Sequence, residues 1–106
     1  MKKRREQFGK ATYDLDELKK FIDEGNFDIT RICRKEFSRL DYSDKAVIRI
    51  IKRLRKAEIY KTMPSKKIPD LMQDVYHTRE KEDSFYIKLQ KSSCGNRCII
   101  IQFKLL

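Results

Sequence analysis

The chain has 106 residues, a formal net charge of +10 and hydrophobic residues at 40% of its positions. This length and composition predict one small domain with one core, and they exclude wholesale disorder. No apolar run reaches the roughly 18 residues of a membrane span, and no apolar segment follows the charged start to form a secretory signal. We therefore expect a cytoplasmic protein with no membrane partner.

The positive charge is concentrated in the middle of the chain. Residues 31–67 hold 13 lysine and arginine residues against 4 acidic ones, whereas the two flanking segments are nearly balanced. A block of this kind is typical of a surface that binds a polyanion. A solubilising surface is the alternative, but such surfaces usually mix both signs. The block therefore favours a nucleic-acid partner.

Three cysteines, Cys33, Cys94 and Cys98, are expected to be reduced thiols, because the chain has no export signal. Cys94 and Cys98 have C-x3-C spacing, which raises the alternative of a zinc site. A second ligand pair is missing, however, and His77 is the only histidine. We expect no metal and no cofactor, and the role of Cys94 and Cys98 stays open.

The first half of the chain predicts helices after a basic arm. The arm covers residues 1–10, and a single domain is expected over residues 11–106. Asp14 and Glu17 form a capping-box-like pair for a first helix that stops at Gly25. Residues 26–29 fit a short strand or a turn. Thr30 then caps a second helix with four residues roughly on one apolar side: Ile32, Cys33, Phe37 and Leu40.

A third helix is predicted from Ser43 to about Lys56, and it is the most amphipathic of the three. Its apolar face is formed by Val47, Ile50, Ile51 and Leu54. A different face carries Arg49, Lys52, Arg53 and Lys56. The apolar face is short for a membrane-surface helix, so we expect it to pack on a sheet with the basic face outward. That basic face suits RNA, DNA or an acidic protein equally well.

The second half of the chain alternates apolar and polar residues, which predicts antiparallel strands. They are expected at residues 59–63, 71–77, 85–90 and 99–105, with a turn at residues 92–97. In the last strand one face should hold Ile99, Ile101, Phe103 and Leu105. The fold class is therefore α+β, with about three helices followed by three or four antiparallel strands.

The last two strands make a prediction about register. If their hairpin is centred on Gly95, Tyr86 faces Lys104 directly, and both side chains point away from the apolar face. A shift of one residue in the turn would break this pairing.

The sequence contains no glycine-rich phosphate loop, nucleophile elbow or metal-ligand cluster. RNA can nevertheless be cleaved without a metal, because its 2′-hydroxyl can attack the neighbouring phosphorus. That reaction needs a base, an acid and cations around the phosphate. The candidate groups are Lys61, Gln73, His77, Tyr86 and Lys104. A packing tyrosine and solvated lysines are the alternative interpretation.

At these residues the sequence resembles the MqsR family of type II toxins, the motility quorum-sensing regulator group of mRNA interferases. The resemblance lies in four segments, Ile59–Met63, Met72–Tyr76, Phe85–Lys88 and Ile101–Lys104, and in the opening stretch Ala11–Lys19. Met72 stands where the family usually has tryptophan.

The resemblance implies a RelE/ParE-like fold and a metal- and ribosome-independent endoribonuclease that cleaves mRNA at GC-containing sites and so inhibits translation and growth. It implies neutralisation by an MqsA-like antitoxin with zinc-binding and helix-turn-helix domains. The family's active-site residues fall on Lys61, Gln73, Tyr86 and Lys104. RNA contacts are expected from Tyr60, His77, Arg79, Arg49, Lys52, Arg53 and Lys56.

Two other functions compete with this one. A non-catalytic RNA- or DNA-binding regulator would use the helix from Ser43 to Lys56, although no helix-turn-helix pair is evident. A toxin of the same fold with another target, such as gyrase, is the second.

Overall fold

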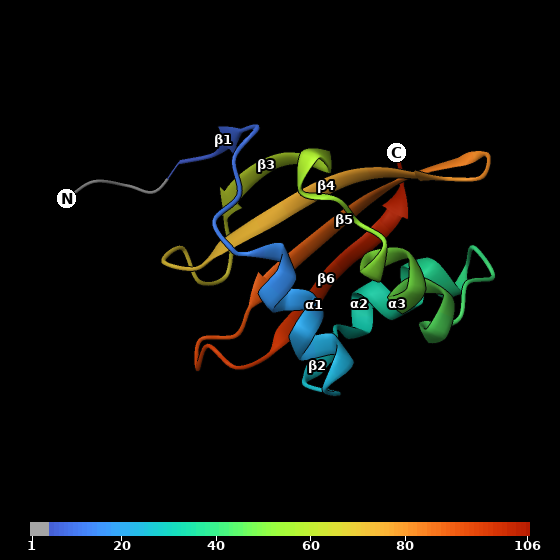
Figure 1. The fold of residues 1–106 in the computed structure, drawn as a ribbon, viewed down its shortest axis with the longest axis horizontal. Helices are drawn as coiled ribbons and strands as arrows, with labels where there is room; N and C mark the ends of the chain where they lie inside the picture. Colours follow the sequence, from blue (N-terminus) through green and yellow to red (C-terminus); the bar gives the residue numbers. More distant parts are fainter. Residues whose placement is uncertain (1–4) are drawn as a thin grey trace.

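A computed structural model describes residues 5–106, so Lys2, Lys3 and Arg4 of the predicted arm lie outside the described residues. The described part contains three α-helices, α1 (Leu15–Asp23), α2 (Arg31–Ser38) and α3 (Asp44–Lys52), and the short 3-10 helix η1 (Lys56–Glu58). Its six strands are β1 (Gln7–Phe8), β2 (Phe27–Ile29), β3 (Ile59–Pro64), β4 (Met72–Glu80), β5 (Asp83–Lys91) and β6 (Cys98–Leu105). Figure 1 shows the strands in one twisted sheet with the helices beside it.

The sheet has the order β1-β3-β4-β5-β6-β2. All neighbouring strands are antiparallel except β2 and β6, which are parallel. The predicted α+β class is confirmed, but three or four strands was too few. The two additional strands are edge strands: β1, of two residues, was not predicted, and β2, of three residues, settles residues 26–29 as a strand rather than a turn. Strands that short do not show an alternating pattern in the sequence.

The predicted helix starts are confirmed by their caps. Asp14 accepts a hydrogen bond from the Asp16 amide, Thr30 from the Cys33 amide and Ser43 from the Ala46 amide. Each of these side chains satisfies an amide that the helix itself leaves free.

Two details of the predicted helices are wrong. Glu17 does not complete a capping box, because its carboxylate binds the Lys91 ammonium at 2.7 Å. Helix α3 ends at Lys52 rather than Lys56. The amides of Arg53 and Leu54 bond to carbonyls three residues back, which tightens the last turn and carries Leu54 into the core.

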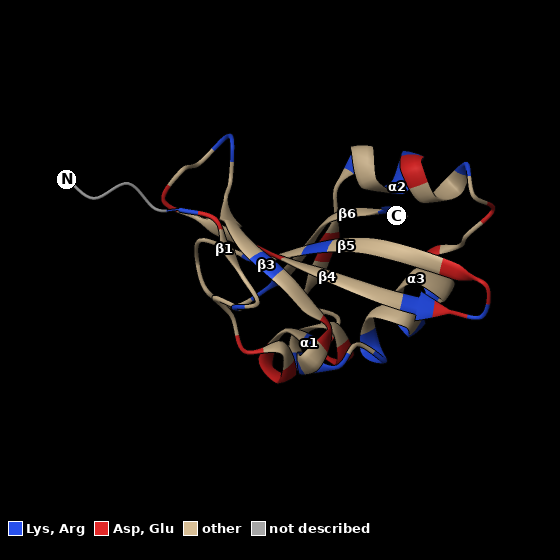
Figure 2. Ribbon diagram, turned by 90° about the horizontal axis from the view of Figure 1, so that it is seen from above, with Lys and Arg blue, Asp and Glu red and all other residues tan. Residues whose placement is uncertain are grey.

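The hydrophobic core lies between the helices and one face of the sheet, here called the inner face. That face carries Phe85, Ile87 and Leu89, and it packs against buried residues of all three helices. The opposite face is called the outer face. Figure 2 shows α1 and α3 on one side of the strands and α2 next to β6. On the predicted apolar side of α2, Cys33 and Phe37 are buried in the core as expected, whereas Ile32 is 68% exposed.

The predicted apolar face of β6 is interrupted by an irregularity. Lys88 pairs with Gln102 while Leu89 pairs with Ile100, so Ile101 has no partner on β5. This bulge changes the alternation along β6. Phe103 and Ile100 are therefore both buried in the core, whereas Ile101 turns to the outer face.

Candidate active site on the outer face of the sheet

Tyr86 and Lys104 form the centre of the site, and the register predicted for them is confirmed. They are direct cross-strand partners on β5 and β6. The Lys104 ammonium lies 4.8 Å from the centre of the Tyr86 ring, within the range of a cation–π contact. Burial raises the pKa of the Tyr86 hydroxyl, so this group remains protonated at neutral pH and can donate a hydrogen bond.

Lys61 reaches the same face from β3. It pairs with Val75 of β4, and Val75 pairs in turn with Lys88 of β5, so the two lysines flank one buried valine. The Lys61 ammonium forms an ion pair with Glu6, and this hydrogen bond raises the pKa of Lys61. Lys61 therefore carries a positive charge at neutral pH and can hold an anion.

Lys88 also belongs to the candidate site, although it was not among the predicted site residues. Its ammonium lies 5.8 Å from the Tyr86 ring centre, on the same ring as Lys104. Burial lowers the pKa of Lys88, and the charges of Lys61 and Lys104 lower it further. The alternation of Tyr86, Lys88 and Gln90 along one strand was the signal that could have identified it. We call Lys61, Lys88 and Lys104 the lysine cluster.

His77 completes the aromatic part of the site. Its ring stacks on Tyr60 with centroids 3.9 Å apart, and it lies 5.8 Å from Tyr86, its partner on β5. A bulge between Ile59 and Lys61 places Tyr60 next to His77. The Nε2 atom of His77 is buried and has no hydrogen-bond partner among the described residues. Burial lowers the pKa of His77, and the charge of Lys61 adds to this, so the imidazole is neutral at pH 7.

Gln73 lies on the outer face, next to Gln90 rather than next to Tyr86. It is 7% exposed, and its Nε2 donates a hydrogen bond to Gln90 Oε1 at 3.0 Å. Arg79 is further away, near the turn between β4 and β5, where its Nε donates to the carbonyl of Lys81. The structure therefore brings Lys61, Tyr86 and Lys104 together, with Gln73 as a neighbour and Arg79 apart.

The basic residues of the third predicted helix lie elsewhere. Helix α3 packs on the inner face, and several of its cations have acidic partners. Arg53 binds Glu80 at 2.8 Å, and Lys56 in η1 binds Asp16 at 3.0 Å. Lys52 pairs with Asp23, and Arg49 is exposed. An RNA contact by these residues stays a prediction, and such RNA would lie on the opposite side of the sheet from Tyr86.

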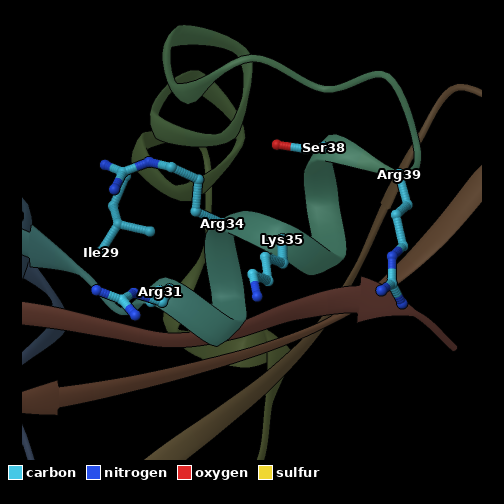
Figure 3. Close-up of a pocket in the computed structure, with 6 residues that line it drawn as sticks. All are labelled: Ile29, Arg31, Arg34, Lys35, Ser38 and Arg39. Carbon is cyan, nitrogen blue, oxygen red and sulfur yellow. The ribbon is translucent and has the colours of Figure 1, made fainter.

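A second cationic surface lies on α2. An open pocket of about 710 Å³ is lined by the residues shown in Figure 3, Ile29, Arg31, Arg34, Lys35, Ser38 and Arg39. Arg34 pairs with Asp44 at 3.1 Å. Figure 3 shows Arg31 and Lys35 on α2 and Arg39 just after its end, and these three cations provide positive charge outside the lysine cluster.

The cysteines do not form a joint site. Cys33 and Cys98 are buried, and burial raises the pKa of each thiol to about 12. Cys94 is exposed in the turn before β6. Within residues 5–106 there is no group of three or more His, Cys, Asp or Glu side chains placed to hold a metal ion. None of the described helices has the length and apolar character to cross a membrane.

His77 gives a prediction about pH and stability. Because its pKa is lower in the folded state than the usual value near 6.5, the unfolded chain takes up the proton first as the pH falls. The contribution of the neutral His77 imidazole to the free energy of unfolding is complete above the unfolded-state pKa near 6.5. It is lost as the pH falls from there through the lower folded-state pKa. We expect wild type to lose more stability than His77→Gln between pH 7.5 and pH 5, measured as the shift in urea midpoint at each pH. Equal losses in the two proteins would contradict this role of His77.

The geometry defines a basic α+β protein whose outer sheet face gathers three lysines, a tyrosine and a histidine, a combination suited to an anionic ligand. Residues 10–105 match a protein family described as motility quorum-sensing regulator, toxin of MqsA. The match covers nearly the whole chain, so the protein belongs to the MqsR toxin family. It is a toxin of a toxin–antitoxin system, and its partner is an antitoxin. No curated protein matches the chain.

Proposed function

We propose that the protein is a cytoplasmic endoribonuclease that cleaves mRNA at GC-containing sites without a metal or the ribosome, and so inhibits translation and growth. The observation that carries the proposal is the Tyr86 ring with the Lys88 and Lys104 ammonium groups 5.8 Å and 4.8 Å from its centre. Lys61 and His77 lie on the same face. This arrangement supplies proton-transfer groups and positive charge in one place, which phosphodiester cleavage requires.

The proposed reaction is an internal transfer at phosphorus. The 2′-hydroxyl gives up its proton, its oxygen forms a bond to phosphorus, and the bond from phosphorus to the 5′ oxygen breaks. The leaving oxygen takes a proton, so the products are a 2′,3′-cyclic phosphate and a 5′-hydroxyl. Lys61 and Lys104 stabilise the charge on the phosphate, and Tyr86 transfers a proton or stacks on a base.

Other residues have supporting roles in the proposal. His77 is neutral at pH 7, its ring lies 5.8 Å from the Tyr86 ring, and it is the candidate acceptor of the 2′-hydroxyl proton. Gln73 orients the phosphate or a base edge from the adjacent position. Tyr60, stacked on His77, and Arg79, near the turn between β4 and β5, make further RNA contacts.

The direct test is incubation of the purified chain with naked RNA in the presence of EDTA. Cleavage that leaves 2′,3′-cyclic phosphate ends supports the proposal. Binding without cleavage supports a non-catalytic RNA- or DNA-binding regulator instead, and neither result points to a toxin with another target. Growth arrest on expression should be relieved by an MqsA-like antitoxin with zinc-binding and helix-turn-helix domains.

Glu6 competes with RNA in this proposal, because its carboxylate occupies the Lys61 ammonium that should bind a phosphate. We expect Glu6→Gln to bind RNA about twofold to fivefold more tightly than wild type, which is the scale of an exposed ion pair. Fluorescence anisotropy with a labelled RNA measures the affinity. Glu82→Gln, an exposed carboxylate in the turn between β4 and β5, controls for the change in net charge. An equal gain in both variants would show that Glu6 has no special position.

A further inference from the structure

A cavity of about 490 Å³ opens on the outer face, next to Lys88. The loop between β3 and β4 lies on one side of it, β5 and β6 form its floor, and the start of α2 closes another side. Its volume falls in the range of about 300–1,000 Å³ that is usual for small-molecule sites. Lys88 lines this cavity and also contacts Tyr86, so the cavity adjoins the candidate active site.

Part of the cavity lining is apolar. Ile99 and Ile101 of β6 lie along it, and Ile32 of α2 faces it from the other side. Ile32 is 68% exposed and Ile68 in the β3–β4 loop is 52% exposed, so both apolar side chains are open to a ligand in the cavity. Apolar side chains on opposite sides of a cavity can hold a nucleobase by its faces.

The floor of the cavity offers hydrogen bonds. Gln73 Nε2 donates one hydrogen to Gln90 Oε1, so the Gln73 oxygen and the Gln90 amide group keep hydrogen-bonding capacity, and both residues line the cavity. Gln102 lines the same cavity, and its side chain has no hydrogen bond to any residue in the described range 5–106. Glutamine side chains supply both acceptors and donors, which can pair with the edge of a base.

Positive charge surrounds the cavity. Lys66 and Lys67 line it from the β3–β4 loop, and Lys88 lines it on the side of Tyr86. Within the lining there is no acidic residue to repel a phosphate. A nucleotide whose base occupied the cavity would thus have cations for the phosphates on both sides of it.

We propose that this cavity binds the base of a nucleotide next to the scissile phosphate, and that Gln90 and Gln102 select that base. The inference rests on the proposed ribonuclease function. It names the part of the protein that gives the cleavage its sequence preference.

The experiment compares wild type, Gln90→Leu and Gln102→Leu on RNAs in which each position near the cut is varied through all four bases. Single-turnover rates give the discrimination at every position. We expect the variants to lose about tenfold or more of the discrimination at one position and to keep it at the others. Gln102 is less buried than Gln90, so Gln102→Leu tests the proposal even if Gln90→Leu fails to fold.

Asn96→Leu in the exposed turn between β5 and β6 is the control, and it should preserve the discrimination of wild type. Unchanged discrimination at every position in Gln102→Leu would overturn the proposal. So would a uniform loss of rate with the base preference intact, because this would indicate a general role in folding or phosphate binding.

Failure of the proposed function is distinguishable from failure of this inference. If wild type cleaves no RNA, the ribonuclease proposal fails, and the cavity is then tested by binding of 2′-O-methyl trinucleotides that differ in one base. A base preference in the affinity that is lost in Gln102→Leu supports the cavity. Equal affinity for all four bases, or a preference that survives the substitution, overturns it.

Discussion

Tyr86→Phe is expected to fold like wild type and to cleave naked RNA about 10²–10⁴ times more slowly, because one positioned proton-transfer group contributes on this scale. The substitution removes only the hydroxyl and keeps the ring that contacts Lys88 and Lys104. Packing and RNA stacking are thereby preserved, so a loss of rate reports on the hydroxyl itself. Single-turnover cleavage with saturating protein measures the rate free of differences in affinity.

The matched control for Tyr86→Phe is Tyr42→Phe. Tyr42 packs on Phe85 and Phe103 of the inner face, and its hydroxyl bonds to Asp83 at 3.2 Å. Tyr42→Phe removes the same hydroxyl oxygen on the inner side of the sheet, so cleavage should remain near the wild-type rate. A Tyr86→Phe protein that cleaves as fast as the control would show that Tyr86 only stacks on a base or packs.

Lys61→Ala provides a second, independent measure of the same site. Its loss should reduce both cleavage and RNA affinity, because a fixed positive charge is removed, and the affinity should depend less steeply on salt. Lys20→Ala on the exposed surface of α1 removes the same charge elsewhere. If the two lysine variants behave alike, the position of Lys61 has no special importance.

The sequence predicted the partner of Tyr86 on β6 correctly, but it assumed a regular hairpin, and the hairpin contains a bulge. A turn centred on Gly95 predicted that Tyr86 pairs with Lys104, and it does. Near the turn, however, Leu89 pairs with Ile100, and the bulge at Ile101 restores the predicted register farther along. Local alternation does not reveal a bulge, because the extra residue changes the face without changing the composition.

A second bulge explains why the alternation of residues in β3 did not predict on which face of the sheet Lys61 lies. The pairing shifts between Ile59 and Lys61, and Tyr60 contacts His77 while Lys61 lies beside Val75. Strict alternation would separate neighbouring side chains to opposite faces. Both bulges occur beside the candidate site, where they direct additional side chains to the outer face.

Contacts between distant segments are the other part that the sequence did not reveal. Glu6 reaches Lys61 through the pairing of β1 with β3, and the charged residues of α3 and η1 find acids on α1, β4 and the segment before α1. A helical pattern shows that a basic face exists. It does not show whether the partners of that face are acids of the same chain or phosphates.

Asp74→Ala is expected to lower the free energy of unfolding by roughly 3–6 kcal/mol, since it removes two hydrogen bonds to a charged acceptor, each worth about 1.5–3 kcal/mol. Asp74 is 0% exposed on β4. Its carboxylate accepts the Thr12 amide at 3.0 Å and the Tyr13 amide at 2.9 Å, which ties the segment before α1 to the centre of the sheet. Urea unfolding followed by circular dichroism measures the change.

Asp70→Ala, an exposed carboxylate in the loop before β4, should cost less than about 0.5 kcal/mol. Asp74→Asn keeps one oxygen as acceptor and should fall between the two. The same anchor holds the chain that continues back to Glu6, so release of residues 12 and 13 should also loosen the ion pair on Lys61. RNA affinity per folded molecule would then rise in Asp74→Asn as stability falls. A loss of stability with unchanged affinity would show instead that the anchor and the Glu6 contact are independent.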